Sequence, residues 1–148
     1  TGVEVYDTAR RMIERIKSGP YPIKNEDIFI DVSISPISVD MEGLTKMAIE
    51  SVKLIGSDPF MSGVNMSVGL SNIAIMLPKN AKDGSLLKAQ VESAFLTMTI
   101  PHGLNHIIGT AGRDYRFLPE DNLVYSIFRK AVSSEGMDTL MRVQEMYQ

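Results

Sequence analysis

The chain has 148 residues, of which 44% are hydrophobic, and a formal net charge of −3 at pH 7. This apolar content is enough for one compact core, and the slightly acidic balance argues against a nucleic-acid surface, which needs a basic stripe. The chain has no cysteine, so disulfides, thiolate metal sites and thiol nucleophiles are excluded. No apolar run approaches the roughly 18 residues of a membrane span. We expect a cytoplasmic protein with a single domain over residues 1–148.

The first half of the chain shows a helix, a strand and a second helix. A helix is predicted over residues 5–17, because its apolar residues recur at spacings of three and four. The run 28–32, Ile-Phe-Ile-Asp-Val, is typical of a strand that is buried on both faces. Ser38 or Asp40 is then expected to cap a helix that Gly56 ends.

The second half continues the alternation of strands and helices. Strands are predicted at 65–70 and 104–108, and helices at about 85–99, 120–133 and 137–147. Three strands that alternate with about five helical segments predict an α/β fold with a parallel sheet and right-handed crossovers.

Polar residues stand where the predicted strands end, which is where βα barrels carry their functional groups. Asp31 ends the first strand, Asn72 follows the second, and the segment 105–110 belongs to the third. Each has a structural alternative. Asp31 can cap the next helix or bind loop amides, and Asn72 can be a turn residue with a left-handed backbone.

Two arginines and two histidines complete the set of candidate residues. Arg113 and Arg116 lie in a loop after the last strand, where they can meet a ligand carboxylate or lie in solvent. His102 and His106 are four residues apart, but a proline and a glycine beside them rule out helical spacing. Neither a cysteine nor a suitably placed carboxylate completes a ligand set, so no metal site is predicted.

One motif resembles a known family. Residues 68–73, Val-Gly-Leu-Ser-Asn-Ile, are followed by Leu77-Pro78, which resembles the Gly-Leu/Val-Ser-Asn-Val/Ile-Ser…Leu-Pro motif of the pterin-binding methyltransferases. That family includes the folate domain of cobalamin-dependent methionine synthase and the methyltetrahydrofolate:corrinoid methyltransferases of anaerobes. The Ile-Asp that ends at Asp31, about forty residues earlier, and the Gly-Leu-Asn that ends at Asn105 also resemble the family pattern. The resemblance covers roughly residues 25–110.

The resemblance implies a fold and a reaction. The fold is the C-terminal part of a (β/α)8 TIM barrel, about strands six to eight, forming a pterin-binding-like domain. The reaction is methyl transfer between tetrahydrofolate and a corrinoid (cobalamin) protein, with methyltetrahydrofolate as the substrate and the cobalamin carried by a separate protein partner.

The resemblance also implies roles for individual residues. Asp31 binds the pterin, since a carboxylate accepts two parallel bonds from the N–H and amino groups on one ring edge. Asn72 is the catalytic residue, and its amide stabilises charge that develops near N5 as the methyl group leaves. Ser71, Asn105 and Arg113 are the further expected substrate contacts.

The chain departs from the family pattern in three places. Ala74 and Ile75 replace a serine and a polar or aromatic residue, and Asn105 replaces a frequent aspartate. The run 109–112, Gly-Thr-Ala-Gly, replaces an Asn-Pro or Asp-Pro pair. These changes point to a divergent branch of the family.

Other functions remain open. A dihydropteroate synthase-like pterin enzyme would need a Lys-x-x-Arg-x-His-type constellation on late strands, and the sequence shows none. A non-catalytic barrel fragment, or an interaction module that completes a barrel with a partner, is the alternative from a different class. Met- and Leu-rich helices near the end of the chain indicate a homodimer.

Overall fold

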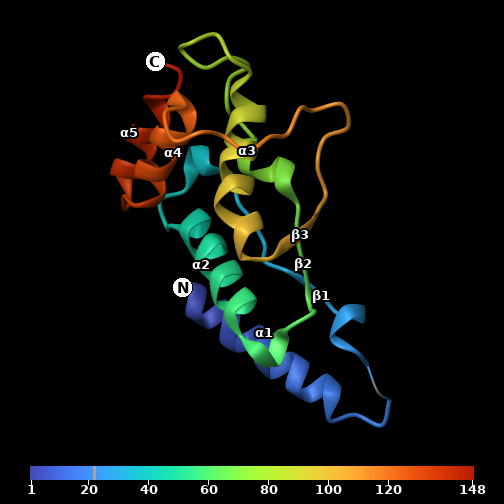
Figure 1. Ribbon diagram of the computed structural model, residues 1–148. Coiled ribbons are helices and arrows are strands. Elements are labelled where there is room, and N and C mark those ends of the chain that lie inside the picture. Colours follow the sequence, from blue (N-terminus) through green and yellow to red (C-terminus); the bar gives the residue numbers. More distant parts are fainter. Residues whose placement is uncertain (22) are drawn as a thin grey trace.

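The computed structural model describes residues 1–21 and 23–148 and shows a small parallel sheet with helices packed against it (Figure 1). The elements are α1 (Gly2–Lys17), β1 (Phe29–Asp31), α2 (Leu44–Ser57), β2 (Asn65–Val68), α3 (Leu87–Thr99), β3 (Leu104–Ile107), α4 (Leu123–Val132) and α5 (Met137–Gln144). The strands pair in the order β1-β2-β3, and both pairs are parallel. The predicted α/β class, with parallel strands that alternate with helices, is confirmed.

Helix α1 begins at Gly2, three residues before the predicted start, because Thr1 and Glu4 form a capping box. The Thr1 hydroxyl accepts a hydrogen bond from the Glu4 backbone N–H at 3.3 Å, and the Glu4 carboxylate accepts one from the chain's amino group. Gly2 also lets α1 approach α2 closely, since a Cβ atom there would lie 2.5 Å from the Cβ of Glu50.

Gly43 occupies the N-cap position of α2, and of the two expected caps Asp40, not Ser38, binds the first N–H groups of the helix. The buried Asp40 carboxylate accepts hydrogen bonds from the backbone N–H groups of Leu44 at 2.7 Å and Thr45 at 2.8 Å. Gly56 was expected to end this helix, but it lies inside the last turn. A Cβ atom at Gly56 would stand 1.9 Å from the carbonyl oxygen of His102, so the glycine is needed for close packing.

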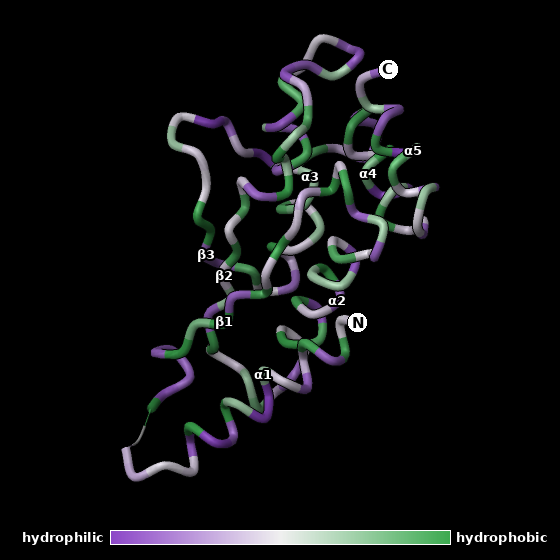
Figure 2. Tube along the Cα trace, turned by 180° about the vertical axis from the view of Figure 1, so that it is seen from behind, coloured by the Kyte–Doolittle hydropathy of each residue, from purple (hydrophilic) through white to green (hydrophobic). Residues whose placement is uncertain are grey.

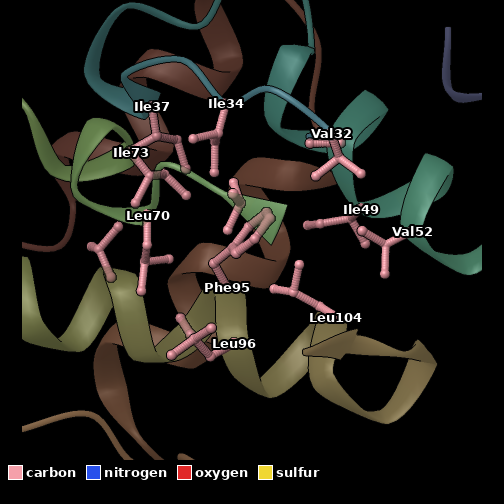
Figure 3. Close-up of a cluster of buried hydrophobic side chains, with 14 of the residues drawn as sticks. Val32, Ile34, Ile37, Ile49, Val52, Leu70, Ile73, Phe95, Leu96 and Leu104 are labelled. Atoms are coloured by element: carbon pink, nitrogen blue, oxygen red, sulfur yellow. The ribbon is translucent and has the colours of Figure 1, made fainter. Parts of the chain in front are cut away.

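The two faces of the sheet differ in what covers them. Figures 1 and 2, seen from opposite sides, both place the helices on one side of the strands. The strand residues on that side are buried, namely Met66, Val68 and Leu104. Figure 3 shows Phe95 of α3 surrounded by side chains from α2, β3 and the loops after β1 and β2. The core therefore lies between the sheet and the helices.

The opposite face of the sheet is largely polar, and no helix of the described residues covers it. Phe29 and Asp31 of β1 are exposed, and their register partners on β2, Asn65 and Ser67, are half-buried. The prediction that the run 28–32 is buried on both faces is therefore wrong, because Phe29 is 57% exposed.

Helices α4 and α5 pack on the side away from the strands (Figure 1). Helix α4 begins at Leu123, later than predicted, because the Asn122 side chain caps it by accepting a hydrogen bond from the backbone N–H of Tyr125 at 2.9 Å. Over the part of the chain that the structure describes, no helix combines the length and the apolar character needed to cross a bilayer.

Candidate functional site

The carboxyl ends of the three strands meet at one edge of the sheet, because all of the strands run parallel. Asp31 is the last residue of β1, and its register partner on β2 is Ser67. Asn72 lies in the 3-10 turn Leu70–Ala74, which directly follows β2. The structure thus brings Asp31 and Asn72 to the same edge of neighbouring strands, as predicted.

Asp31 is held by a tight turn but keeps free binding capacity. Its Oδ1 accepts a hydrogen bond from the backbone N–H of Ser33 at 2.8 Å. Ser33 has a φ of 53°, a left-handed conformation that is uncommon for a serine. The hydrogen bonds of the described residues include none to Oδ2, and the side chain is exposed. The turn therefore orients the carboxylate and leaves one oxygen fully available to a ligand.

Asn72 is exposed, and only its backbone is used by the turn. Its N–H donates to the Gly69 carbonyl at 3.0 Å, and its carbonyl accepts from the Ile75 N–H at 3.2 Å. The positive backbone angle in this loop falls on Met76, at 68°, so the left-handed alternative for Asn72 is wrong. No hydrogen bond within the described residues engages the Asn72 amide, which can therefore donate to a ligand.

Gly69 makes room for the Asn72 side chain. A Cβ atom at Gly69 would lie 3.1 Å from the Asn72 Nδ2 atom, closer than ordinary van der Waals contact. The glycine of the Gly-Leu-Ser-Asn motif thus lets the amide fold back over the end of β2. The backbone φ of −75° at this position is open to any residue, so the glycine provides space for the amide and not a special backbone conformation.

Ser71 lies half-buried in the same turn, and its role as a substrate contact stays a prediction. The hydroxyl that does fix this loop belongs to Ser38, which donates to the Ile75 carbonyl oxygen at 3.0 Å. Because Ser38 follows β1, this bond joins the loop that carries Asn72 to the segment after Asp31.

Asn105 lies on the second residue of β3, where the pairing with β2 shifts register. Its Oδ1 accepts from the Met66 backbone N–H at 3.0 Å, and its Nδ2 donates to the Asn65 Oδ1 at 3.0 Å. The Asn105 amide therefore joins two strands. Its predicted contact with a substrate is not tested, and a ligand would have to compete with these two bonds.

Arg113 forms an ion pair with Glu92 of α3, whose side chain is fully buried. Burial raises the pKa of the Glu92 carboxyl, an effect that the Tyr115 hydroxyl and the Arg113 guanidinium oppose. The second carboxylate oxygen, Oε2, is buried without a hydrogen-bond partner among the described residues. A carboxylate in this position keeps the guanidinium of Arg113 in place.

The loop that carries Arg113 is fastened along α3 by buried and half-buried polar residues that the sequence analysis missed. The Arg116 N–H donates to the Ser93 hydroxyl at 3.3 Å, and the Leu118 N–H donates to the Thr97 hydroxyl at 3.0 Å. Glu92, Ser93 and Thr97 stand among the apolar residues of 91–98, Val-Glu-Ser-Ala-Phe-Leu-Thr-Met. Their position there was the available signal that a polar segment packs against this helix.

His106 belongs to the segment 105–110 that was predicted to lie at this edge of the sheet, although the sequence analysis assigned it no role in binding. It pairs with Ser67, which in turn pairs with Asp31, so the three residues stand at matching positions across the strands. The His106 ring meets the Phe29 ring edge-on, with centroids 4.8 Å apart, and its Nδ1 lies 2.9 Å from the Asn105 Oδ1. Within the described ranges, no group of three or more His, Asp or Glu side chains is placed to hold a metal ion.

Asp31 also borders a hollow of about 460 Å³ between α1 and β1, lined mainly by apolar residues such as Met12 and Ile16. Comparisons of this chain with protein-family models and with curated proteins give no match.

Proposed function

We propose that this chain binds a reduced folate at the carboxyl edge of its sheet and acts in methyl transfer between methyltetrahydrofolate and a corrinoid on a separate protein. The observation that carries the proposal is the placement of Asp31 and Asn72. They lie on the same edge of neighbouring strands, and both are exposed with polar atoms left over for a ligand. In this proposal the three strands are about strands six to eight of a (β/α)8 barrel, and their polar face turns toward the barrel interior.

Asp31 would anchor the pterin ring. One edge of a pterin presents a ring N–H and an amino group side by side, and a carboxylate accepts two such bonds at once. The Ser33 N–H occupies only one lone pair of Oδ1, so both oxygens keep an acceptor site. The fixed turn orients the carboxylate before the ligand arrives, which lowers the entropic cost of binding.

Asn72 would act on the N5 nitrogen that carries the methyl group. The methyl group leaves N5 without its bonding electron pair, which stays on the nitrogen, and N5 then takes up a proton. An amide N–H aimed at N5 stabilises the charge that develops there. The corrinoid, when bound, supplies the electron pair that forms the new bond to the methyl group.

A non-catalytic role is the second candidate, and the apolar hollow beside β1 favours it. Met12 of α1 is 60% exposed and Phe29 of β1 is 57% exposed. These surfaces suit a polypeptide that extends the sheet past β1, as in a module that completes a barrel with a partner. Folate binding by this chain distinguishes the two functions, since a purely structural module needs no pterin site.

A dihydropteroate synthase-like activity and a homodimer are two further proposals. Dihydropteroate synthase-like chemistry has the weaker support, because β3 reads Leu-Asn-His-Ile and carries no lysine or arginine. A homodimer through α5 is consistent with Met137 and Met141, which are 59% and 53% exposed on that helix. Sedimentation equilibrium of the chain would test the dimer.

The experiment that tests the proposed function is calorimetric titration with methyltetrahydrofolate. We expect saturable binding that weakens at least tenfold in Asp31→Ala, because a hydrogen bond to a charged group is worth about 1.5–3 kcal/mol. Asp27→Ala is the matched control, since Asp27 is an exposed aspartate in the 3-10 turn at the other end of β1 and should bind like the unmodified chain. A folded chain that binds no folate, or an Asp31→Ala variant with unchanged affinity, would contradict the proposal.

A further inference from the structure

Strand β3 contains a bulge that decides which side chain it presents on the polar face of the sheet. Leu104 pairs with Met66, and Ser67, the next residue of β2, pairs with His106. Asn105 is therefore an extra residue in β3. Because side chains alternate between the two faces of a strand, this extra residue moves His106 from the buried face to the polar face. Bulges commonly re-aim a side chain in this way beside active sites.

The Asn105 side chain takes the place of a backbone group in the bulge, and its contacts fix which way its amide points. Its Oδ1 accepts a hydrogen bond from the Met66 N–H at 3.0 Å, and a backbone N–H can only donate. Its Nδ2 donates to the Asn65 Oδ1 at 3.0 Å, and the Asn65 Nδ2 donates to the Glu26 carbonyl oxygen at 2.8 Å. These bonds therefore run in one direction, and they leave an Asn105 oxygen that can accept another hydrogen.

This oxygen sets the tautomer of His106. The ring Nδ1 lies 2.9 Å from the Asn105 Oδ1, and a carboxamide oxygen can only accept, so Nδ1 carries a hydrogen. The other ring nitrogen, Nε2, then holds the lone pair of the neutral ring or the acidic proton of the charged ring. The Phe29 ring, which meets the imidazole at 76°, limits its rotation. The hydrogen bonds and ion pairs found among the described residues include none to Nε2.

His106 is exposed on the polar face, in line with Asp31. Because neighbouring strands lie about 4.7–4.9 Å apart, the backbones of these two residues, on the first and third strands, are about 9–10 Å apart. A pterin whose amino edge binds Asp31 would reach across the small Ser67 side chain and bring its second ring, which contains N5, toward His106. Strand β2 places no ionisable side chain between them.

Proton uptake by N5 needs a group that Asn72 cannot replace. An amide donates a hydrogen bond but does not release its proton near neutral pH, so Asn72 can stabilise charge at N5 without protonating it. A histidine side chain both binds and releases a proton near neutral pH. Asp31 is engaged by the other edge of the ring, which leaves His106 as the group on this face with the required chemistry.

We propose that His106 is the general acid that protonates N5 as the methyl group leaves, and that Asn105 positions it. The inference rests on the proposed function, since it names the proton donor for that reaction. When the bond between N5 and the methyl carbon breaks, its electron pair stays on N5, and the methyl carbon bonds to the electron pair that the reduced corrinoid brings. The proton of Nε2 moves to N5 and leaves a neutral imidazole, which takes up another proton from water. In the opposite direction, the neutral Nε2 removes the proton from N5.

The tautomer of His106 can be measured without any folate. The chain has two histidines, so nitrogen NMR of histidine-labelled protein gives two sets of ring signals, which His106→Ala assigns. We expect neutral His106 to carry its hydrogen on Nδ1, and His102, which is exposed, to show the Nε2–H form that free histidine prefers in water. Asn105→Ala removes the acceptor and should return His106 to the Nε2–H form.

Single-turnover methyl transfer to reduced cobalamin tests the proton donor. We expect His106→Ala to slow transfer by about a hundredfold, since general acids typically contribute roughly 10²–10⁴ in rate, while its calorimetric affinity for methyltetrahydrofolate stays close to that of the unmodified chain. Added imidazole should restore the rate of this variant in proportion to its concentration at fixed pH, and should not change the unmodified chain. His102→Ala is the matched control and should transfer normally, since His102 is exposed in the 3-10 turn Ile100–His102 before β3.

The outcomes separate this inference from the proposed function. Normal transfer by His106→Ala, or a slow variant that imidazole does not rescue, would overturn the role of His106 while the pterin site stands. An unmodified chain that binds no folate would overturn the proposed function, and the proton-donor role with it. The Nε2–H form of neutral His106 in the unmodified chain would overturn the positioning by Asn105, whether or not folate binds.

Discussion

The loops after β1 and β2 differ from the loop after β3 in what their polar side chains contact. Asp31 uses one lone pair internally, and the Asn72 amide is exposed and unengaged within the described residues. After β3, Arg113 is bound to the buried Glu92, and Tyr115 accepts a hydrogen bond from Thr110. Polar residues at strand ends are thus of two kinds, one available to a ligand and one that holds a loop in place.

The difference between these two kinds of polar residue has a physical cause. A buried charge such as Glu92 must be compensated, because removing it from water costs several kcal/mol, so its neighbours are committed to it. An exposed amide or carboxylate is compensated by water and can exchange that water for a ligand. Substitutions of the residues that hold a loop in place should therefore change stability, and substitutions of the residues that are available to a ligand should change binding or rate.

The largest expected effect is on methyl transfer in Asn72→Ala. Loss of a donor aimed at developing charge costs about 2.7–4 kcal/mol, or roughly 10²–10³ in rate. Single-turnover transfer from methyltetrahydrofolate to reduced cobalamin, followed by absorbance, would measure it. Asn80→Ala in the same connection is the matched control and should transfer at the unmodified rate. An Asn72→Ala variant that binds folate and transfers normally would remove Asn72 from the catalytic role.

The next largest effect is on stability in Arg113→Ala. This change leaves the buried Glu92 carboxylate without its partner, which costs about 1–3 kcal/mol. Urea unfolding should show the loss. The control is Arg116→Ala, whose pair with Asp114 is exposed on both sides and contributes under about 1 kcal/mol. Equal stability of the two variants would contradict the expectation that the buried ion pair contributes more to stability than the exposed one.

A smaller effect is expected from Gly69→Ala. The added Cβ atom would stand 3.1 Å from the Asn72 Nδ2 and push the amide away by a few tenths of an ångström. Because catalysis is sensitive to such displacements, we expect transfer to slow by about tenfold. Urea unfolding should change by less than about 1 kcal/mol, since the backbone conformation suits alanine. Normal transfer in this variant would mean that Asn72 can act from more than one position.

The smallest effect concerns the pH dependence of stability in Glu92→Gln. Burial raises the pKa of Glu92, so the folded state holds this proton more tightly than the unfolded state. The resulting stability is complete below the ordinary pKa of glutamate and is lost as the pH rises through the folded value. Glutamine does not titrate, so the variant should gain stability relative to the unmodified chain across this window. A stability difference that stays constant with pH would contradict the shifted pKa.

Much of the fold was predictable because its signals are local. The spacing of apolar residues indicated the α-helices α1 to α5, and short segments bounded by turns indicated the strands β1 to β3, with errors of a few residues at the ends. Those errors have identifiable causes, such as the capping box of Thr1 and Glu4 and the Asn122 cap. The positions of Asp31 and Asn72 followed as well, since parallel strands place their carboxyl ends at one edge.

The sequence by itself determined the α/β class, the order of the elements and the edge at which Asp31 and Asn72 lie. Only the tertiary structure decided which polar residues stay available, because that depends on contacts between distant parts of the chain. Asn105 meets Met66 across 39 positions, and Arg113 meets Glu92 across 21. No local pattern encodes such pairs, since burial and close approach arise only when the helices pack on the sheet.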